Sequence, residues 1–177
     1  MEAEFSAENF TSIDVELANN DMSSVCEIGA VRFRGGKLVE TWRVMVNPDC
    51  EYEKLYHSQL HGITAKHTAT APSLAEVHGT LRSFLFEETC IFHGASNFDR
   101  NCLSEACKKS GVEDVTELAI WVSTLVLAQQ QWPDQPSHKL ENLCKQIGHE
   151  YLPHNALEDA IAAAALYRAL SGSTPTP

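Results

Sequence analysis

The sequence predicts an α/β fold in which one mixed sheet carries helices on its faces. Three β-prone segments follow one another between residues 9 and 46, and from residue 73 onward helical spacing alternates with short apolar runs. Strands joined by tight turns form an antiparallel meander, whereas strands separated by helices pair in parallel. We therefore expect a three-stranded meander extended by parallel strands, with helices on both sides.

The meander is predicted from alternation and turn residues. Asn9–Asp14 alternates and is β-prone, and Val25–Arg34 forms the second strand. The dipeptide Gly35-Gly36 is a two-residue hairpin signal. Lys37–Val46 completes the hairpin, and Asn47-Pro48 ends it.

Helices dominate the rest of the chain. A capping box from Ser73 to Glu76 begins a helix with apolar residues at helical spacing up to Leu85. A second capping box, from Asn155 to Glu158, begins the last helix, which is expected to reach about Leu170. Between them we expect short strands at 89–93 and 119–122 and helices at 97–110, 124–132 and 139–147. Residues 1–170 are expected to form a single domain, with a disordered tail at 171–177.

Composition narrows the class of protein. The chain has 177 residues, 44% of them hydrophobic, without an apolar run long enough for a membrane span. Its acidic first residues lack the pattern of a signal peptide, so we expect a cytoplasmic protein. The net charge of −11 argues against a strong, non-specific grip on duplex DNA. It leaves open a nucleic-acid enzyme whose carboxylates bind divalent metals.

The cysteines predict buried hydrophobic positions. None of the six forms a Cys-x-x-Cys pair, so a zinc site is poorly supported. Four lie among apolar residues and are expected to be buried: Cys26, Cys90, Cys102 and Cys144.

Five residues form a pattern with chemical meaning. Asp14 and Glu16 lie two apart, so both side chains point to one face of a strand and repel unless a cation lies between them. Asp99 follows a predicted strand and begins a helix. His154 and Asp159 flank the start of the last helix, and a loop histidine suits a general base near neutral pH. Each residue alone is better explained by an ordinary surface or helix-start role, so the argument depends on their combination.

In that order the five residues resemble the DEDDh family of 3′–5′ exonucleases, which includes the proofreading epsilon subunit of bacterial DNA polymerase III, RNase T and oligoribonuclease. The resemblance covers about Asn9 to Leu170. Further segments look familial: 13–19 (IDVELAN), 28–29 (IG), 47–48 (NP), 61–64 (HGIT), 137–140 (SHKL) and 154–159 (HNALED).

The resemblance implies an RNase H-like fold and a two-metal hydrolysis. Asp14, Glu16, Asp99 and Asp159 would hold two Mg²⁺ or Mn²⁺ ions, and His154 would take the proton from the attacking water. Hard oxygen ligands favour these metals over zinc. The product would be a nucleoside 5′-monophosphate.

The resemblance also implies contacts with the terminal nucleotide. These residues are Leu17, His61, Ile63 and Phe98. For Phe98 we favour packing in the core over stacking on a base, and for His61 a helix end with Gly62 as its cap is the alternative. His138 and Lys139 are expected either to approach backbone phosphates or to serve the start of a helix.

Two departures from the family pattern stand out. Many members carry Thr where Leu17 stands. The segment from His93 to Asp99 is one residue longer than usual, which puts the hydrogen bonds that support Asp99 in doubt.

Several functions remain open at this stage. The expected partners are 3′ ends of nucleic acids, with DNA favoured over RNA or short oligonucleotides. A polymerase partner and the oligomeric state are undetermined. An alternative of another class is a catalytically weak adaptor that binds a protein, and a sugar-phosphate or nucleotide phosphatase is a third. Metal-dependent hydrolysis would distinguish the enzyme from the adaptor.

Overall fold

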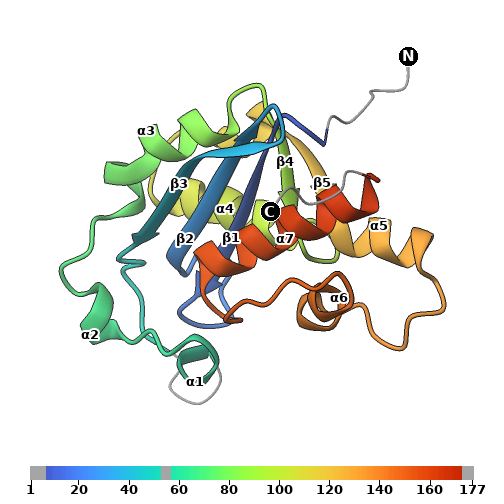
Figure 1. Ribbon diagram of the computed structural model, residues 1–177. Coiled ribbons are helices and arrows are strands. Elements are labelled where there is room, and N and C mark those ends of the chain that lie inside the picture. The colour runs from blue at the N-terminus through green and yellow to red at the C-terminus, as the bar shows by residue number, and fades with distance from the viewer. Residues whose placement is uncertain (1–6, 53–56, 173–177) are drawn as a thin grey trace.

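A computed structural model describes residues 7–52 and 57–172. Five strands form one sheet in the order β3-β2-β1-β4-β5 (Figure 1). The strands are β1 (Phe10–Leu17), β2 (Val25–Arg34), β3 (Lys37–Met45), β4 (Thr89–Phe92) and β5 (Ile120–Ser123). The first three pair antiparallel, and β4 and β5 continue the sheet in parallel from β1. The predicted mixed sheet is therefore confirmed.

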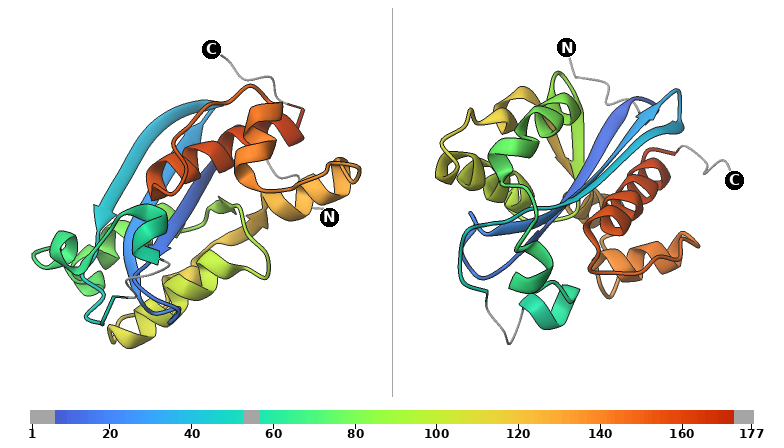
Figure 2. Two further views of the ribbon diagram at one scale, coloured as in Figure 1. Left: turned by 90° about the horizontal axis from the view of Figure 1, so that it is seen from below. Right: turned by 90° about the vertical axis from the view of Figure 1, so that its left-hand side faces the viewer.

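Helices cover both faces of this sheet. They are α1 (His57–His61), α2 (Ala65–Thr68), α3 (Leu74–Leu85), α4 (Phe98–Lys109), α5 (Thr124–Gln131), α6 (Leu140–Gln146) and α7 (Ala156–Leu170), with a 3₁₀ turn, η1 (Val115–Leu118). Figure 2 shows α3 and α4 on one side of the sheet and α7 on the other. Helices α5 and α6 pack against α7.

The layers follow from alternation along the strands. Ile13, Val15 and Leu17 of β1 join one apolar cluster with residues of α3 and α4. On the other face, Phe10 contacts the ring of Tyr167 from α7, with centroids 5.1 Å apart. Period two therefore separates the side chains of β1 into two cores.

Most of the predicted elements are confirmed. Gly35 and Gly36 have φ values of 55° and 71°, which suit the tight hairpin. Cys26, Cys90, Cys102 and Cys144 are buried, as predicted. The side chain of Glu76 accepts the Ser73 backbone N–H at 2.8 Å, as a capping box requires.

Three predictions need correction. The first strand does not end at Asp14 but continues to Leu17, because residues 15–17 remain paired with β2. The one-turn elements α2 and η1 were not predicted, and of α1 only its end at His61 was considered, since four or five residues are too short to show a helical period. The return bond of the second capping box comes from Asp159, one residue later than Glu158.

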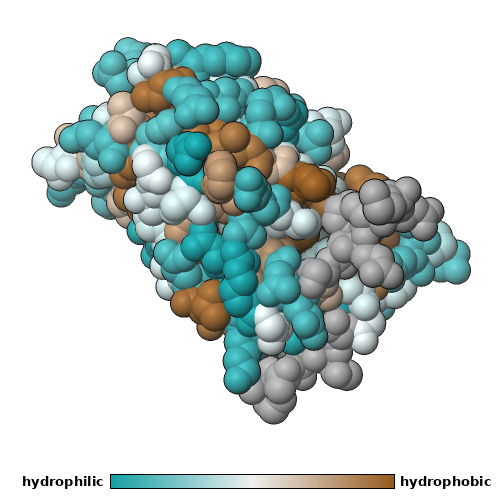
Figure 3. Space-filling view, turned by 90° about the horizontal axis from the view of Figure 1, so that it is seen from above, coloured by the Kyte–Doolittle hydropathy of each residue, from teal (hydrophilic) through white to brown (hydrophobic). Residues whose placement is uncertain are grey.

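Some expectations lie beyond what the structure describes. Residues 173–177 of the predicted tail are outside the described part of the chain. No helix within residues 7–52 and 57–172 combines the length and apolar character that a membrane span requires. The face seen in Figure 3 mixes hydrophilic and hydrophobic residues, without one hydrophobic area that dominates it.

Candidate active site

The site begins on β1. Because Ile13, Val15 and Leu17 face α3 and α4, the intervening Asp14 and Glu16 face α7. Both lie in the carboxyl half of β1, where parallel sheets usually bind ligands. The prediction that these two carboxylates share one face is confirmed.

The start of α7 supplies the next two residues. The Asn155 side chain accepts the N–H of Glu158 at 3.3 Å and so begins the helix. The Asn155 N–H is in turn donated to Asp159 at 3.0 Å, and the Tyr151 hydroxyl also hydrogen-bonds Asp159. His154, just before this turn, is exposed and has a φ of 65°. These bonds orient the Asp159 carboxylate.

Asp99 comes from the opposite side of β1. It lies in the first turn of α4 and is 4% exposed. Strand β1 pairs with β4 at Thr11 and Ser12. Further along β1, the Val15 N–H hydrogen-bonds the Asp99 carboxylate. Backbone N–H groups of Asp99 itself and of Val15 lower the pKa of this carboxyl, so the main chain contributes to its support.

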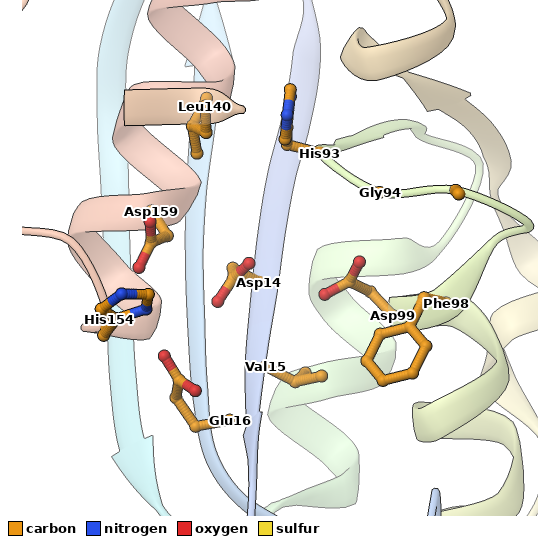
Figure 4. Close-up of a pocket in the computed structure, with 11 residues that line it drawn as sticks. Asp14, Val15, Glu16, His93, Gly94, Phe98, Asp99, Leu140, His154 and Asp159 are labelled. Carbon is orange, nitrogen blue, oxygen red and sulfur yellow. The ribbon is translucent and has the colours of Figure 1, made fainter. Parts of the chain in front are cut away.

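The five residues meet at one cavity (Figure 4). Ligand oxygens of Asp14, Glu16 and Asp159 lie within 4.8 Å of one another. The cavity has a volume of about 370 Å³, and the residues that line it are Asp14, Val15, Glu16, His93, Gly94, Ala95, Phe98, Asp99, Leu140, His154 and Asp159. All five residues singled out from the sequence are among them.

Crowding of carboxylates shifts their acidity. Burial raises the pKa of Asp14 well above its usual value, and the neighbouring carboxylates, with Asp99 the largest contributor, raise it further. The pKa of Glu16 rises to about 8, first through burial and then through Asp159 and Glu27. Burial likewise raises the pKa of Asp99 to about 7, although its N–H bonds oppose the shift. A cation among these oxygens would relieve the repulsion, so the residues fit a divalent metal.

The predicted nucleotide contacts lie in different places. Phe98 is 42% exposed and lines the cavity, so the expectation that it packs in the core is wrong. Leu17 and Ile63 are 6% and 4% exposed and lie in apolar clusters. The His61 ring joins them, since its Nε2 lies 3.0 Å from the Leu17 carbonyl and its Nδ1 accepts the Ile63 N–H at 3.0 Å. The helix end that was the alternative for His61 is present, because α1 ends at His61 and Gly62 has a φ of 77°.

A second groove adjoins the cavity. It has a volume of about 580 Å³, and His138, Lys139 and Tyr151 are among the residues that line it, together with some that it shares with the first cavity. The His138 ring bonds the Trp132 carbonyl at 3.0 Å, which occupies that ring in the loop before α6. Lys139 is exposed beside the groove and is the N-cap residue of α6.

The comparisons with known proteins agree with this geometry. A family model described as Exonuclease, of the RNase T type, matches residues 10–167. The chain belongs to this exonuclease family. It carries a 3′–5′ exonuclease domain of the epsilon-subunit type, and the predicted RNase H-like fold is confirmed.

Relatives of this exonuclease domain include bacterial DNA polymerases III of the PolC type. The chain is 30% identical over 170 residues to a PolC-type DNA polymerase III of Caldanaerobacter subterraneus, and 29% identical over 152 residues to that of Bacillus cereus. The matches cover 94% and 84% of this chain but 12% and 10% of those polymerases. The chain thus spans about a tenth of the length of these curated relatives.

Solved structures of exonucleases share the fold. Exonuclease X in complex with 5′ overhanging duplex DNA has a TM-score of 0.73 and 25% identity, with 95% of this chain and 94% of that chain covered. Escherichia coli exonuclease I in complex with a dT13 oligonucleotide has a TM-score of 0.79 and 16% identity, with 95% and 42% covered.

Two features of the exonuclease site were not predicted from the sequence. Tyr151 reaches Asp159 across a loop, and Glu27 on β2 lies next to Glu16 in the pairing of β1 with β2. The sequence signal for Glu27 is weak: it is an acidic residue at a position where its strand neighbours Cys26 and Ile28 are apolar. No local pattern marks Tyr151.

Proposed function

We propose that this domain hydrolyses single-stranded DNA from the 3′ end in a metal-dependent reaction. The observation that carries this proposal is the convergence of Asp14, Glu16 and Asp159 within 4.8 Å, with Asp99 and His154 lining the same cavity. Such a cluster of partly buried carboxylates is costly to maintain without a cation.

The four carboxylates Asp14, Glu16, Asp99 and Asp159 would hold two Mg²⁺ or Mn²⁺ ions. They offer hard oxygen ligands from two sides of β1, which is the donor type that these ions prefer. Bound divalent ions would supply positive charge to stabilise the oxygens of the phosphate during hydrolysis. The raised pKa values of Asp14 and Glu16 support this assignment, since a bound cation favours their ionised forms.

His154 is proposed as the general base. It lies on an exposed turn, so water reaches its ring. The ring also faces the carboxylate cluster beside Asp159 (Figure 4). The ring would take a proton as a water oxygen bonds the phosphorus, and the 3′ oxygen of the preceding nucleotide would leave. The product is a nucleoside 5′-monophosphate.

The substrate assignment rests on charge and on relatives. A net charge of −11 opposes binding of a long duplex, which favours short or single-stranded 3′ ends. The relatives named above are DNA polymerases III of the PolC type or were solved with DNA. Exposed Phe98 offers a face on which a base can stack, and stacking tolerates any sequence. Leu17, His61 and Ile63 are not among the residues that line the cavity, so their contact with the terminal nucleotide stays a prediction from the resemblance.

The test uses a single-stranded DNA and the RNA of the same sequence, each labelled at its 5′ end. Purified protein is incubated with Mg²⁺, with Mn²⁺ or with EDTA. Asp14→Asn serves as the inactive variant and Asp134→Asn, on an exposed loop, as its matched control. A shortening ladder that needs metal and Asp14, and is faster on DNA, supports the proposal.

Other outcomes reject parts of the proposal. A faster ladder on RNA would assign an exoribonuclease. A ladder that Asp14→Asn leaves unchanged would refute the site. No ladder on either strand, with folded protein and metal present, would favour an adaptor that binds a protein partner.

A further inference from the structure

A buried carboxylate outside the cavity connects the sheet to the start of α7. Glu27 on β2 is 0% exposed and pairs directly with Glu16 of β1. Its Oε1 accepts a hydrogen bond from Arg43 Nε at 3.0 Å and forms an ion pair with Arg43 Nη2 at 2.8 Å. Its Oε2 accepts the backbone N–H of Ala156 at 3.1 Å. Each oxygen of Glu27 therefore has its own partner.

The Ala156 N–H is one of the donors at the start of α7 that have no partner within the helix itself. The Asn155 side chain accepts the N–H of Glu158, and Glu27, on the face of β2 that α7 covers, accepts that of Ala156. A carboxylate at a helix N-terminus also interacts favourably with the helix dipole. Glu27 is thus a second cap for α7, supplied by β2.

The backbone of α7 also rests directly on β2. A Cβ atom added to Gly29 would lie 2.1 Å from the Ala156 carbonyl carbon and 2.2 Å from the Leu157 nitrogen. Gly29 pairs with Asp14 on β1, so this contact lies beside the carboxylate cluster. Glu27 and Gly29 together hold the first turn of α7 at one distance from the sheet.

That turn carries Asp159 and follows His154. Because Asp159 accepts the Asn155 N–H at 3.0 Å, residues 154–159 form one hydrogen-bonded unit. A shift of Ala156 would therefore move both His154 and Asp159 relative to Asp14 and Glu16. We infer that Glu27, held by Arg43, is a positioning residue that sets Asp159 and His154 against the carboxylates of β1. This inference rests on the proposed function, in which those residues bind metal and carry a proton.

The competing explanation is that Glu27 only adds negative charge near a cation. Two substitutions separate the explanations. Glu27→Gln and Glu27→Ala both remove the charge, but glutamine keeps the length of the side chain and an oxygen that can accept the Ala156 N–H. Arg43, whose side chain is 43% exposed, can then turn toward solvent.

The experiment measures Mn²⁺ binding by calorimetry without nucleic acid, and then kcat and KM on a labelled oligonucleotide. Partners that orient metal ligands contribute roughly 10- to 100-fold to affinity or activity. We therefore expect Glu27→Ala to weaken Mn²⁺ binding about tenfold or more and to lower kcat. The Mn²⁺ affinity and kcat of Glu27→Gln should stay within about threefold of the wild-type values. KM should change little, because Glu27 is not among the residues that line the cavity.

The matched control is Glu88→Gln. Glu88 also pairs with arginines of β2, Arg32 and Arg34, and its side chain is 11% exposed, but it does not line the cavity. This variant should bind Mn²⁺ as wild type does, which separates positioning from general loss of an ion pair.

Three outcomes would overturn the inference. An equal loss of Mn²⁺ affinity in Glu27→Gln and Glu27→Ala would mean that the charge of Glu27 matters and not its bond to Ala156. Wild-type affinity in Glu27→Ala would mean that Glu27 has no effect. Wild-type protein that binds no Mn²⁺ would refute both the inference and the proposed function. Wild-type protein that binds Mn²⁺ but degrades no strand would refute the proposed function alone, while the binding series still tests Glu27.

Discussion

At the scale of single residues, the site depends on acidic groups held close together against their mutual repulsion. Asp14, Glu16 and Asp159 come from two elements and approach within 4.8 Å. Backbone N–H groups, which carry no net charge, orient Asp99 and Asp159. The negative charge of the cluster is therefore left for a bound cation.

Removal of one carboxylate should abolish turnover. Asp14→Asn or Asp159→Asn should lower kcat by several orders of magnitude, roughly 10³-fold or more, because a metal ligand is lost. Without metal, Asp14→Asn should unfold at a temperature no lower than wild type, since a repulsive group has been neutralised. Rate assays and thermal unfolding check both points, and full activity in both variants would contradict the site.

The role of His154 can be separated from metal binding. His154→Ala should lower kcat by about 10²- to 10⁴-fold, the usual contribution of a general base. Mn²⁺ affinity should stay close to wild type, because the carboxylate cluster within 4.8 Å consists of Asp14, Glu16 and Asp159. Calorimetry and steady-state kinetics measure the two effects. A parallel loss of Mn²⁺ affinity would mean that His154 belongs to the metal centre.

Phe98 should matter for binding more than for stability. Its ring is 42% exposed at the cavity, and stacking on a base contributes roughly 1–3 kcal/mol. Phe98→Ala should therefore raise KM for an oligonucleotide about tenfold. The matched control is Phe86→Ala, since Phe86 is 44% exposed at the end of α3 and does not line the cavity. Equal KM values in the two variants would rule out stacking on Phe98.

At the scale of elements, the contact between β2 and α7 decides the geometry. α7 is capped by its own Asn155 and by Glu27, and it lies directly over Gly29. A helix that packs through its side chains can tilt or slide a little on a sheet. Contact through the backbone of Ala156 leaves less freedom, because no flexible side chain lies between.

Gly29→Ala should disturb both stability and function. The added methyl group would meet backbone atoms of Ala156 and Leu157 at 2.1 and 2.2 Å, so α7 must move. Overpacking of this kind costs about 1–3 kcal/mol of unfolding free energy. The activity of the folded variant should also fall, because Asp159 moves with the helix.

The matched control is Gly79→Ala. Gly79 is exposed on α3, and a Cβ there would meet nothing within 4 Å. Alanine in a helix interior is about 0.5–1 kcal/mol better than glycine, so this variant should be more stable and equally active. Urea unfolding and rate assays compare the pair. Equal unfolding free energies for the two variants would contradict the close contact at Gly29.

At the scale of the whole molecule, the protonation of the clustered carboxyl groups links the stability of the fold to metal binding. Folding raises the pKa of Glu16 from 4.5 to about 8 and raises that of Asp14 as well. A carboxyl group with a raised pKa contributes its stability at low pH and loses it as the pH rises through the folded value. In EDTA, the melting temperature should therefore fall between about pH 4.5 and pH 8.

Mn²⁺ should reverse this loss. Ions bind the ionised carboxylates, so the gain in melting temperature should be larger at pH 8 than at pH 5. Thermal unfolding over this pH range, with Mn²⁺ or EDTA, measures the effect. A melting temperature that rises with pH in EDTA, or a metal effect without pH dependence, would contradict the shared carboxylate site.

Local patterns in the sequence account for much of this protein. Alternation located the meander, Gly35 and Gly36 located its turn, and capping residues located the starts of α3 and α7. Period two also placed Asp14 and Glu16 on one face. These features depend on residues within a few positions of one another, and such short-range physics can be read from the order of residues.

Alternation also explains one limit of the prediction. Leu17 is adjacent to Glu16 in the chain, yet it lies 6% exposed in the cluster with α3 and α4. Phe98, expected in the core, is 42% exposed at the cavity. Alternation along β1 places Leu17 on the face opposite Glu16, whereas the exposure of Phe98 depends on how α4 packs against the sheet, which no local pattern shows.

The tertiary structure alone decided which distant groups support the site. The Val15 N–H supports Asp99 where the pairing with β4 has ended, Tyr151 supports Asp159 across a loop, and Glu27 caps a helix 129 positions later. Each of these contacts depends on how the sheet and helices pack, which sums many weak interactions over the whole chain. The sequence by itself thus determined the elements and the acidic residues, and the packing determined their distances and their supports.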